Sequence, residues 1–236
     1  MGKVIQPIIV NGNTSERIKT ILETEFWEYI KEKSIEIYNE QSLQFELGYY
    51  LRKVFTNFNV YIERNTREWI RNTTKHECDI ILVNKSNEEK YAIELKFPRN
   101  GQYPESMFSF IKDIKYMEEL KQAGFKDAFV LTLADDKGFY KITGKEKGDD
   151  NIYLLFRGEK SESENYEPIY TINGEYTKPT GDNKYDIEIQ GNYHVEWKKV
   201  LEKYSIIVKT DKDEIETQEK DIYSYCFRIS ECYKNN

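Results

Sequence analysis

Three charged side chains stand at a spacing that could bind a metal ion and activate water. Asp79 opens one apolar run, and Glu94 and Lys96 lie two residues apart in the next. Two neighbouring carboxylates repel each other, and a divalent cation removes that cost by accepting an oxygen atom from each. An ammonium group beside them can offset the negative charge that develops on a phosphate in the transition state. These residue types therefore suit metal-assisted hydrolysis of a phosphate ester.

Two predicted β-strands carry these side chains. Residues 78–83 and 91–97 are rich in Ile, Leu and Val, and the polar residues 84–89 between them read as a loop. Because side chains alternate along a strand, Glu94 and Lys96 share one face while the apolar residues of the second strand share the other. The second strand therefore presents a carboxylate and an ammonium group side by side.

The apolar pattern also predicts how the two strands pair. An antiparallel register that sets Asp79 opposite Glu94 also sets Ile80 opposite Ile93, so apolar partners stay together on one face. A register slipped by one residue would separate them. We therefore expect Asp79, Glu94 and Lys96 to converge.

The surrounding elements are a helix, a strand, a crossover helix and a further strand. Apolar residues recur at helical spacing in residues 41–56, and residues 59–62 read as a strand. A helix from Pro104 to Gly124 follows the strand that carries Glu94 and Lys96. Residues 127–133 read as a strand that is apolar throughout its middle, as in a strand buried on both faces. The fold class is thus α/β, a central mixed β-sheet flanked by helices in the order αβββαβ.

Residues 140–236 form a β-rich extension of short strand-like pieces, including residues 152–158, 185–191, 193–197 and 222–230. These strands either extend or cap the central sheet, or they form a small separate β-subdomain. We expect one domain, residues 1–236, with its catalytic core at about 40–135.

Composition limits the classes of function. The 236 residues carry a net charge of −7, so bulk attraction to nucleic acid is excluded and any nucleic-acid contact must be local. Three cysteines without a CxxC spacing, with two histidines, argue against a zinc site and fit a reducing cytoplasm. Residues 4–10 are apolar but too short for a membrane span and lack a basic lead, so we expect neither a signal peptide nor a membrane anchor.

A further carboxylate lies on the first of these helices. Glu46 follows Leu43 by three residues and precedes Tyr50 by four, which places it within the apolar stripe of the helix in residues 41–56. A carboxylate directed at a core requires a cation, a metal ion or a hydrogen-bond donor. Glu46 is either such a site residue or a boundary residue that is ion-paired to an arginine.

Asp79 is followed by fourteen residues and then by Glu94-Leu95-Lys96, with the helix of Glu46 before this motif and a crossover helix after it. This arrangement resembles the PD-(D/E)XK nuclease superfamily. The resemblance covers residues 40–135, and Cys78 stands where the family name has Pro. It implies a restriction-endonuclease-like fold, Mg²⁺ (with Mn²⁺ as a substitute) held by Asp79, Glu94 and the Leu95 carbonyl, and catalysis by Asp79, Glu94, Lys96 and Glu46.

The resemblance further implies a DNA endonuclease of a restriction or mobile-element defence system, with a homodimer expected. Residues around the motif could contact phosphate or support the site, namely Arg99, Gln102, Lys112, Lys115 and Arg71. Arg71 also belongs to an arginine-rich segment that could equally be a solvated face.

Two other classes of function remain open. A nuclease-like module could bind DNA or protein without cutting, since the last third of the chain is acid-rich and could mimic DNA. A nuclease for RNA or branched DNA would use the same chemistry. The plainest interpretation of Glu94 and Lys96 is a salt bridge on a solvated sheet face, which contributes little to stability.

Overall fold

The structure is a computed structural model, and it describes residues 13–99, 101–142, 152–157, 171–209 and 215–232. A mixed six-stranded sheet lies at its centre. Only the central pair, β3 and β4, is parallel, and all other neighbours are antiparallel. Across the sheet the strands run in the order β1 (Phe58–Asn65), β2 (Glu77–Asn84), β3 (Lys90–Lys96), β4 (Asp127–Ala134), β8 (Ile215–Arg228) and β7 (Lys198–Lys209).

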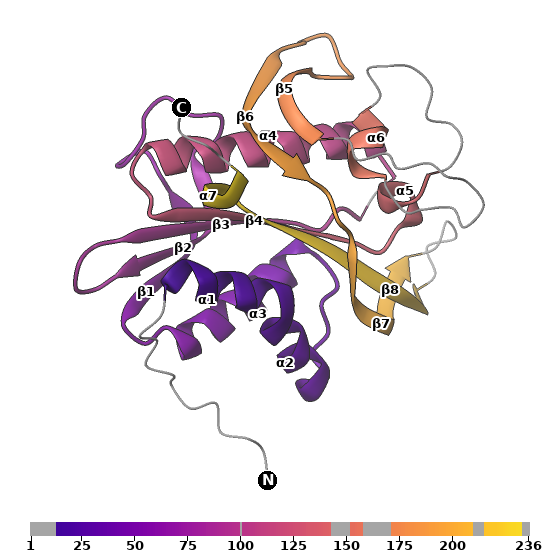
Figure 1. Cartoon of the computed structure of the whole chain (residues 1–236). Helices are drawn as coiled ribbons and strands as arrows, with labels where there is room; N and C mark the ends of the chain where they lie inside the picture. Colours follow the sequence, from indigo (N-terminus) through magenta and orange to yellow (C-terminus); the bar gives the residue numbers. More distant parts are fainter. Residues whose placement is uncertain (1–12, 100, 143–151, 158–170, 210–214, 233–236) are drawn as a thin grey trace.

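Helices cover both faces of this sheet (Figure 1). One face carries α1 (Thr14–Thr20), a π-helical turn η1 (Ile21–Glu25), α2 (Phe26–Lys33) and α3 (Glu40–Val54). The other face carries the crossover helix α4 (Tyr103–Gln122), with a small two-stranded sheet of β5 (Thr171–Thr177) and β6 (Asp186–His194) beside it. Three short helices complete this side, α5 (Lys137–Tyr140), α6 (Ile152–Phe156) and α7 (Ile229–Cys232).

The alternation of side chains along the strands builds two apolar cores. Ile80 and Ile93 pack toward α1–α3, whereas Ile81 and Ala92 pack toward α4. Every residue of β4 is buried, as the sequence predicts for a strand covered on both faces. Burial of this kind supplies the main driving force for folding, and it fixes which side chains of β2 and β3 remain near solvent.

Local sequence explains how α3 reaches the sheet. The side chain of Asn39 accepts a hydrogen bond from the backbone N–H of Ser42, and the Ser42 hydroxyl interacts with the Asn39 backbone, so a capping box starts the helix. A Cβ at Gly48 would lie 2.8 Å from the side chain of Ile62 on β1. Glycine therefore lets α3 lie close against β1.

The predicted element order is confirmed in α3, β1, β2, β3, α4 and β4, and the fold is a mixed α/β sheet flanked by helices. In the extension, β7 and β8 continue the central sheet while β5 and β6 form a second one. Two predictions are wrong: residues 195–197 follow the end of β6 and are not part of a strand, and residues 152–156 are helix α6 and not a strand. A short apolar run fits either structure, and here it packs as a helix against α4. Within the described ranges, no helix is long and apolar enough to span a bilayer.

Candidate functional site

The pairing of β2 with β3 brings the predicted residues to one end of the two strands. Ile80 pairs with Ile93, as predicted, but the regular pairing stops there. Instead of lying in the ladder opposite Glu94, Asp79 accepts a hydrogen bond from the backbone N–H of Leu95 through Oδ2, at 2.7 Å. The strands part at this point, and the Asp79 carboxylate caps a backbone donor of β3.

Asp79 is also contacted by α3. The side-chain nitrogen of Gln44, a buried residue, lies 3.4 Å from Asp79 Oδ1 and 3.3 Å from the Asp79 carbonyl. Burial raises the pKa of Asp79 to about 6, although the Leu95 N–H and the charges of Lys75 and Lys96 act in the opposite direction. The Asp79 carboxylate is thus held by neutral donors in a site that disfavours its charge.

Glu94 is fully buried on the α4 face of the sheet. It forms an ion pair through Oε1 with Lys75, a residue of the loop between β1 and β2, while Glu94 Oε2 has no hydrogen-bond partner among the residues that the structure describes. Lys75 Nζ also lies 3.0 Å from Oδ1 of Asp113, a buried residue of α4. The Asp113 carboxylate therefore joins the predicted residues from the crossover helix.

Lys96 closes the group at the end of β3. Its ammonium group lies 3.4 Å from Glu40 Oε1 at the start of α3 and 3.5 Å from Asp113 Oδ2. Burial alone would lower the pKa of Lys96, but the negative charges of Asp113, Glu40 and Asp79 raise it above its ordinary value of 10.5. Lys96 is therefore a cation at neutral pH and not a general base.

The donor set suits a hard divalent cation. Glu94 Oε2 is a buried carboxylate oxygen without a partner, and Lys96 Nζ lies 3.3 Å from the Leu95 carbonyl oxygen, which places that carbonyl within the group. Carboxylate and carbonyl oxygens are the ligands that Mg²⁺ prefers, and Mg²⁺ commonly takes only one or two carboxylates and keeps several waters. In the described part of the chain, no three or more His, Cys, Asp and Glu side chains form a metal-binding group.

Glu46 lies elsewhere on α3 than the sequence suggests. It is half-buried two residues beyond Gln44, and residues two apart on a helix do not share a face. Glu40 and Gln44, four residues apart, present the face that contacts β2 and β3. Burial raises the pKa of Tyr204 to about 12, and the charge of Glu46 adds to this effect, so Glu46 lies on the Tyr204 side of the helix.

The predicted substrate-binding residues are dispersed around this group. Arg99 is exposed and lies 2.8 Å from Asp135, and the Gln102 backbone carbonyl accepts the Ser106 N–H in the first turn of α4. Lys112 and Lys115 are half-buried on α4, and Arg71 is exposed four residues before Lys75. Of these residues, Lys112 and Lys115 are closest in sequence to the site, because they lie one and two residues from Asp113.

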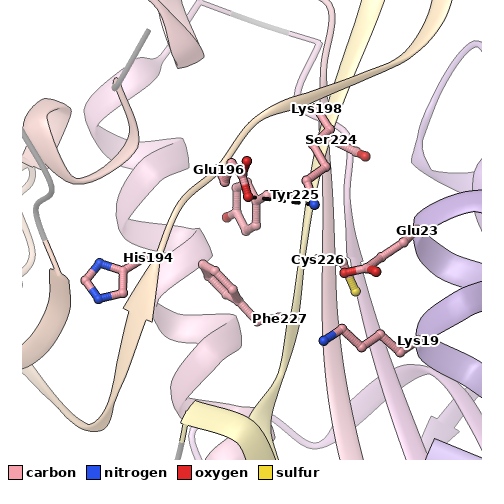
Figure 2. A pocket seen from close by; sticks show the side chains of 9 residues that line it. All are labelled: Lys19, Glu23, His194, Glu196, Lys198, Ser224, Tyr225, Cys226 and Phe227. Atoms are coloured by element: carbon pink, nitrogen blue, oxygen red, sulfur yellow. Dashed lines mark ion pairs between the residues drawn. The ribbon is translucent and has the colours of Figure 1, made fainter. Parts of the chain in front are cut away.

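Two nearby features do not belong to the group. Burial raises the pKa of the Cys78 thiol to about 12, so the neighbour of Asp79 is not a reactive thiol. A cavity of about 230 Å³ lies where β8 passes the end of β6, and its lining shares no residue with the group (Figure 2). Side chains of both charge signs line it, namely Lys19, Glu23, His194, Glu196, Lys198, Ser224, Tyr225, Cys226 and Phe227.

Sequence reasoning missed Lys75, Asp113, Glu40 and Gln44. The sequence could have indicated Asp113, since this carboxylate lies three residues after Phe110 and four before Met117 in the apolar stripe of α4. No sequence pattern indicated Lys75, because it lies in a loop without apolar periodicity. Comparison of the chain with protein-family models, curated proteins and solved structures found no match.

Proposed function

We propose that the chain is a metal-dependent nuclease that hydrolyses phosphodiester bonds in DNA. The observation that carries this proposal is the gathering of Asp79, Glu94 and Lys96 at the point where β2 and β3 part. The resemblance of the Asp79…Glu94-Leu95-Lys96 pattern to the PD-(D/E)XK superfamily favours the same activity.

The residues would divide the work as follows. Asp79, Glu94 and the Leu95 carbonyl would hold Mg²⁺ or Mn²⁺, which when bound supplies an acidified water and a Lewis acid for the phosphate. The Lys96 ammonium stays protonated, so it offsets negative charge on the phosphate and orients the attacking water. Glu40 accepts the backbone N–H of Phe97 at 3.0 Å and so fixes the strand end that carries Lys96.

One observation favours a second function, a nuclease-like module that binds DNA or protein without cutting. Lys75 already neutralises Glu94, and Lys96 already lies between Glu40 and Asp113, so these acids have counter-ions in the protein itself. A static network of this kind would need no metal ion. The Asp79 carboxylate argues for the first function, because among the described residues its hydrogen bonds come from neutral donors.

Cleavage assays distinguish the nuclease from the module that binds without cutting. Plasmid, linear and single-stranded DNA and RNA are incubated with purified protein in Mg²⁺, Mn²⁺ or EDTA, beside Asp79→Asn and Lys96→Met. We expect metal-dependent cleavage of DNA that both variants lose. Lys90→Met is the matched control, because Lys90 lies at the opposite end of β3 and the same change there should leave cleavage intact. Intact substrates in every metal, with retained binding of DNA, would favour the second function.

A further inference from the structure

The ion pairs of Lys75 suggest that this residue regulates cation binding at the site. Its ammonium group contacts Glu94 on β3 and, at 3.0 Å, Asp113 on α4. The two acid side chains are 0% and 2% exposed, whereas the Lys75 side chain is 24% exposed. The carboxylates are thus fixed within core elements, while their counter-ion reaches them from a loop at the surface.

Each of these carboxylates keeps one oxygen without a hydrogen bond. Glu94 Oε2 and Asp113 Oδ2 are both buried and accept no hydrogen bond from the residues that the structure describes, and Asp113 Oδ2 forms an ion pair of 3.5 Å with Lys96 Nζ. A buried carboxylate oxygen without a donor is costly, and native proteins contain few of them. The unpaired oxygens indicate that the ion pairs with lysine do not use the full capacity of the two acids.

A structural ion-pair network is the simplest other explanation. In such a network Lys75 would be a permanent partner, and nothing would replace it. The geometry differs from that case, because the Lys75 ammonium serves two carboxylates and leaves an oxygen of each without a hydrogen bond within the described residues, and only Asp113 Oδ2 has a second ion pair, with Lys96. A divalent cation carries twice the charge and accepts more oxygen ligands than an ammonium group donates to.

We propose that the Lys75 ammonium holds the place of a cation between Glu94 and Asp113, and that a divalent metal ion competes with it for the two carboxylates. Metal binding then releases Lys75 toward solvent. The inference rests on the metal ion of the proposed function but not on cleavage of any substrate. It assigns Asp113 to the metal-binding group and makes Lys75 a built-in competitor of the metal.

Metal affinity tests the competition directly. Mn²⁺ binding is measured by calorimetry and by electron paramagnetic resonance for the wild type, Lys75→Met and the control Lys90→Met. Methionine keeps the length of the stem without its charge, so we expect Lys75→Met to bind Mn²⁺ at least about tenfold more tightly. Lys90→Met should bind as the wild type does. Equal or weaker binding by folded Lys75→Met would overturn the inference.

A second measurement uses the wild-type protein and so does not depend on the folding of a variant. Lysines are labelled with an amine-acylating reagent and quantified by mass spectrometry, with and without Mn²⁺. Released Lys75 should be labelled several-fold faster in Mn²⁺, while Lys90 should be unchanged. Unchanged labelling of Lys75 in protein saturated with Mn²⁺ would overturn the competition.

The outcomes separate this inference from the proposed function. Tighter Mn²⁺ binding by Lys75→Met without cleavage of any nucleic acid would support competition and reject the nuclease. Cleavage of nucleic acid, together with the same Mn²⁺ affinity in Lys75→Met as in the wild type, would support the nuclease and reject competition. A chain that binds no Mn²⁺ in either form would reject both.

Discussion

The Asp79 carboxylate should destabilise the metal-free protein at neutral pH. Its pKa in the folded chain is about 6 against an ordinary value of 3.8, mainly because of burial. A rise of this size corresponds to about 3 kcal/mol, taken as an upper bound, that favours the protonated form in the fold. Asp79→Asn removes the charge and keeps an oxygen for the Leu95 N–H. We therefore expect the variant to be more stable than the wild type by about 1–3 kcal/mol at pH 7.5 in EDTA.

The pH dependence has a definite sign. Since the folded pKa of Asp79 is raised, the folded state binds more protons than the unfolded state between about pH 4 and pH 6, and stability contributed by this group falls as pH rises. The difference between the wild type and Asp79→Asn should therefore be largest above pH 6 and vanish near pH 4. Urea denaturation followed by circular dichroism at several pH values measures it.

Addition of Mg²⁺ should shrink this difference, because a cation at the site would stabilise the wild-type carboxylate. Asp127→Asn is the control, because we expect this change to lower the stability of the protein. Asp127 is also buried, but Arg228 Nε lies 2.6 Å from it, and breaking such a pair costs about 3–5 kcal/mol. An Asp79→Asn variant that is less stable than the wild type at pH 7.5 in EDTA would refute the reasoning and make Asp79 a structural anchor of β3.

Three further changes probe the site and its supports. Lys96→Met should lower any cleavage rate by about 10²–10³-fold while leaving circular dichroism unchanged, because it removes the charge that faces the phosphate. Glu118→Ala removes the acceptor of the Tyr193 hydroxyl and of two backbone N–H groups in β6, so we expect a loss of about 1–3 kcal/mol and faster hydrogen exchange in β6. Gly138→Ala would place a Cβ in steric clash with the hydroxyl-bearing edge of the Tyr103 ring, and urea denaturation should show a loss of about 1–3 kcal/mol.

The central elements were predictable because each carries a periodic apolar pattern. Alternation in β2 and β3 admits one register that keeps Ile80 opposite Ile93, and the structure has that register. The middle of β4 is apolar, which predicted a strand buried on both faces, and every residue of β4 is buried. Residues 152–156 have only five positions, which is too short for periodicity to separate a helix from a strand.

The site was predictable only where its residues lie on those elements. The predicted helix begins at residue 41 and leaves out Glu40, whereas the capping box of Asn39 starts the helix at Glu40. That single residue decides which carboxylate of α3 reaches Lys96. Lys75 lies in a loop whose path depends on tertiary contacts, so no local pattern could bring it to Glu94.

The charges at the end of β3 do not form the solvated salt bridge that was the alternative interpretation of Glu94 and Lys96. A surface ion pair between Glu94 and Lys96 would leave both side chains in water, but Glu94 is fully buried and forms an ion pair with Lys75 instead. In the part of the chain that the structure describes, the hydrogen bonds of the Asp79 carboxylate come from the Gln44 amide and the Leu95 N–H, which are neutral donors. A fold selected for stability alone would gain by replacing such a carboxylate with a neutral side chain. Retention of the Asp79 charge is what a cation-binding site requires, and the stability of Asp79→Asn in EDTA measures its cost.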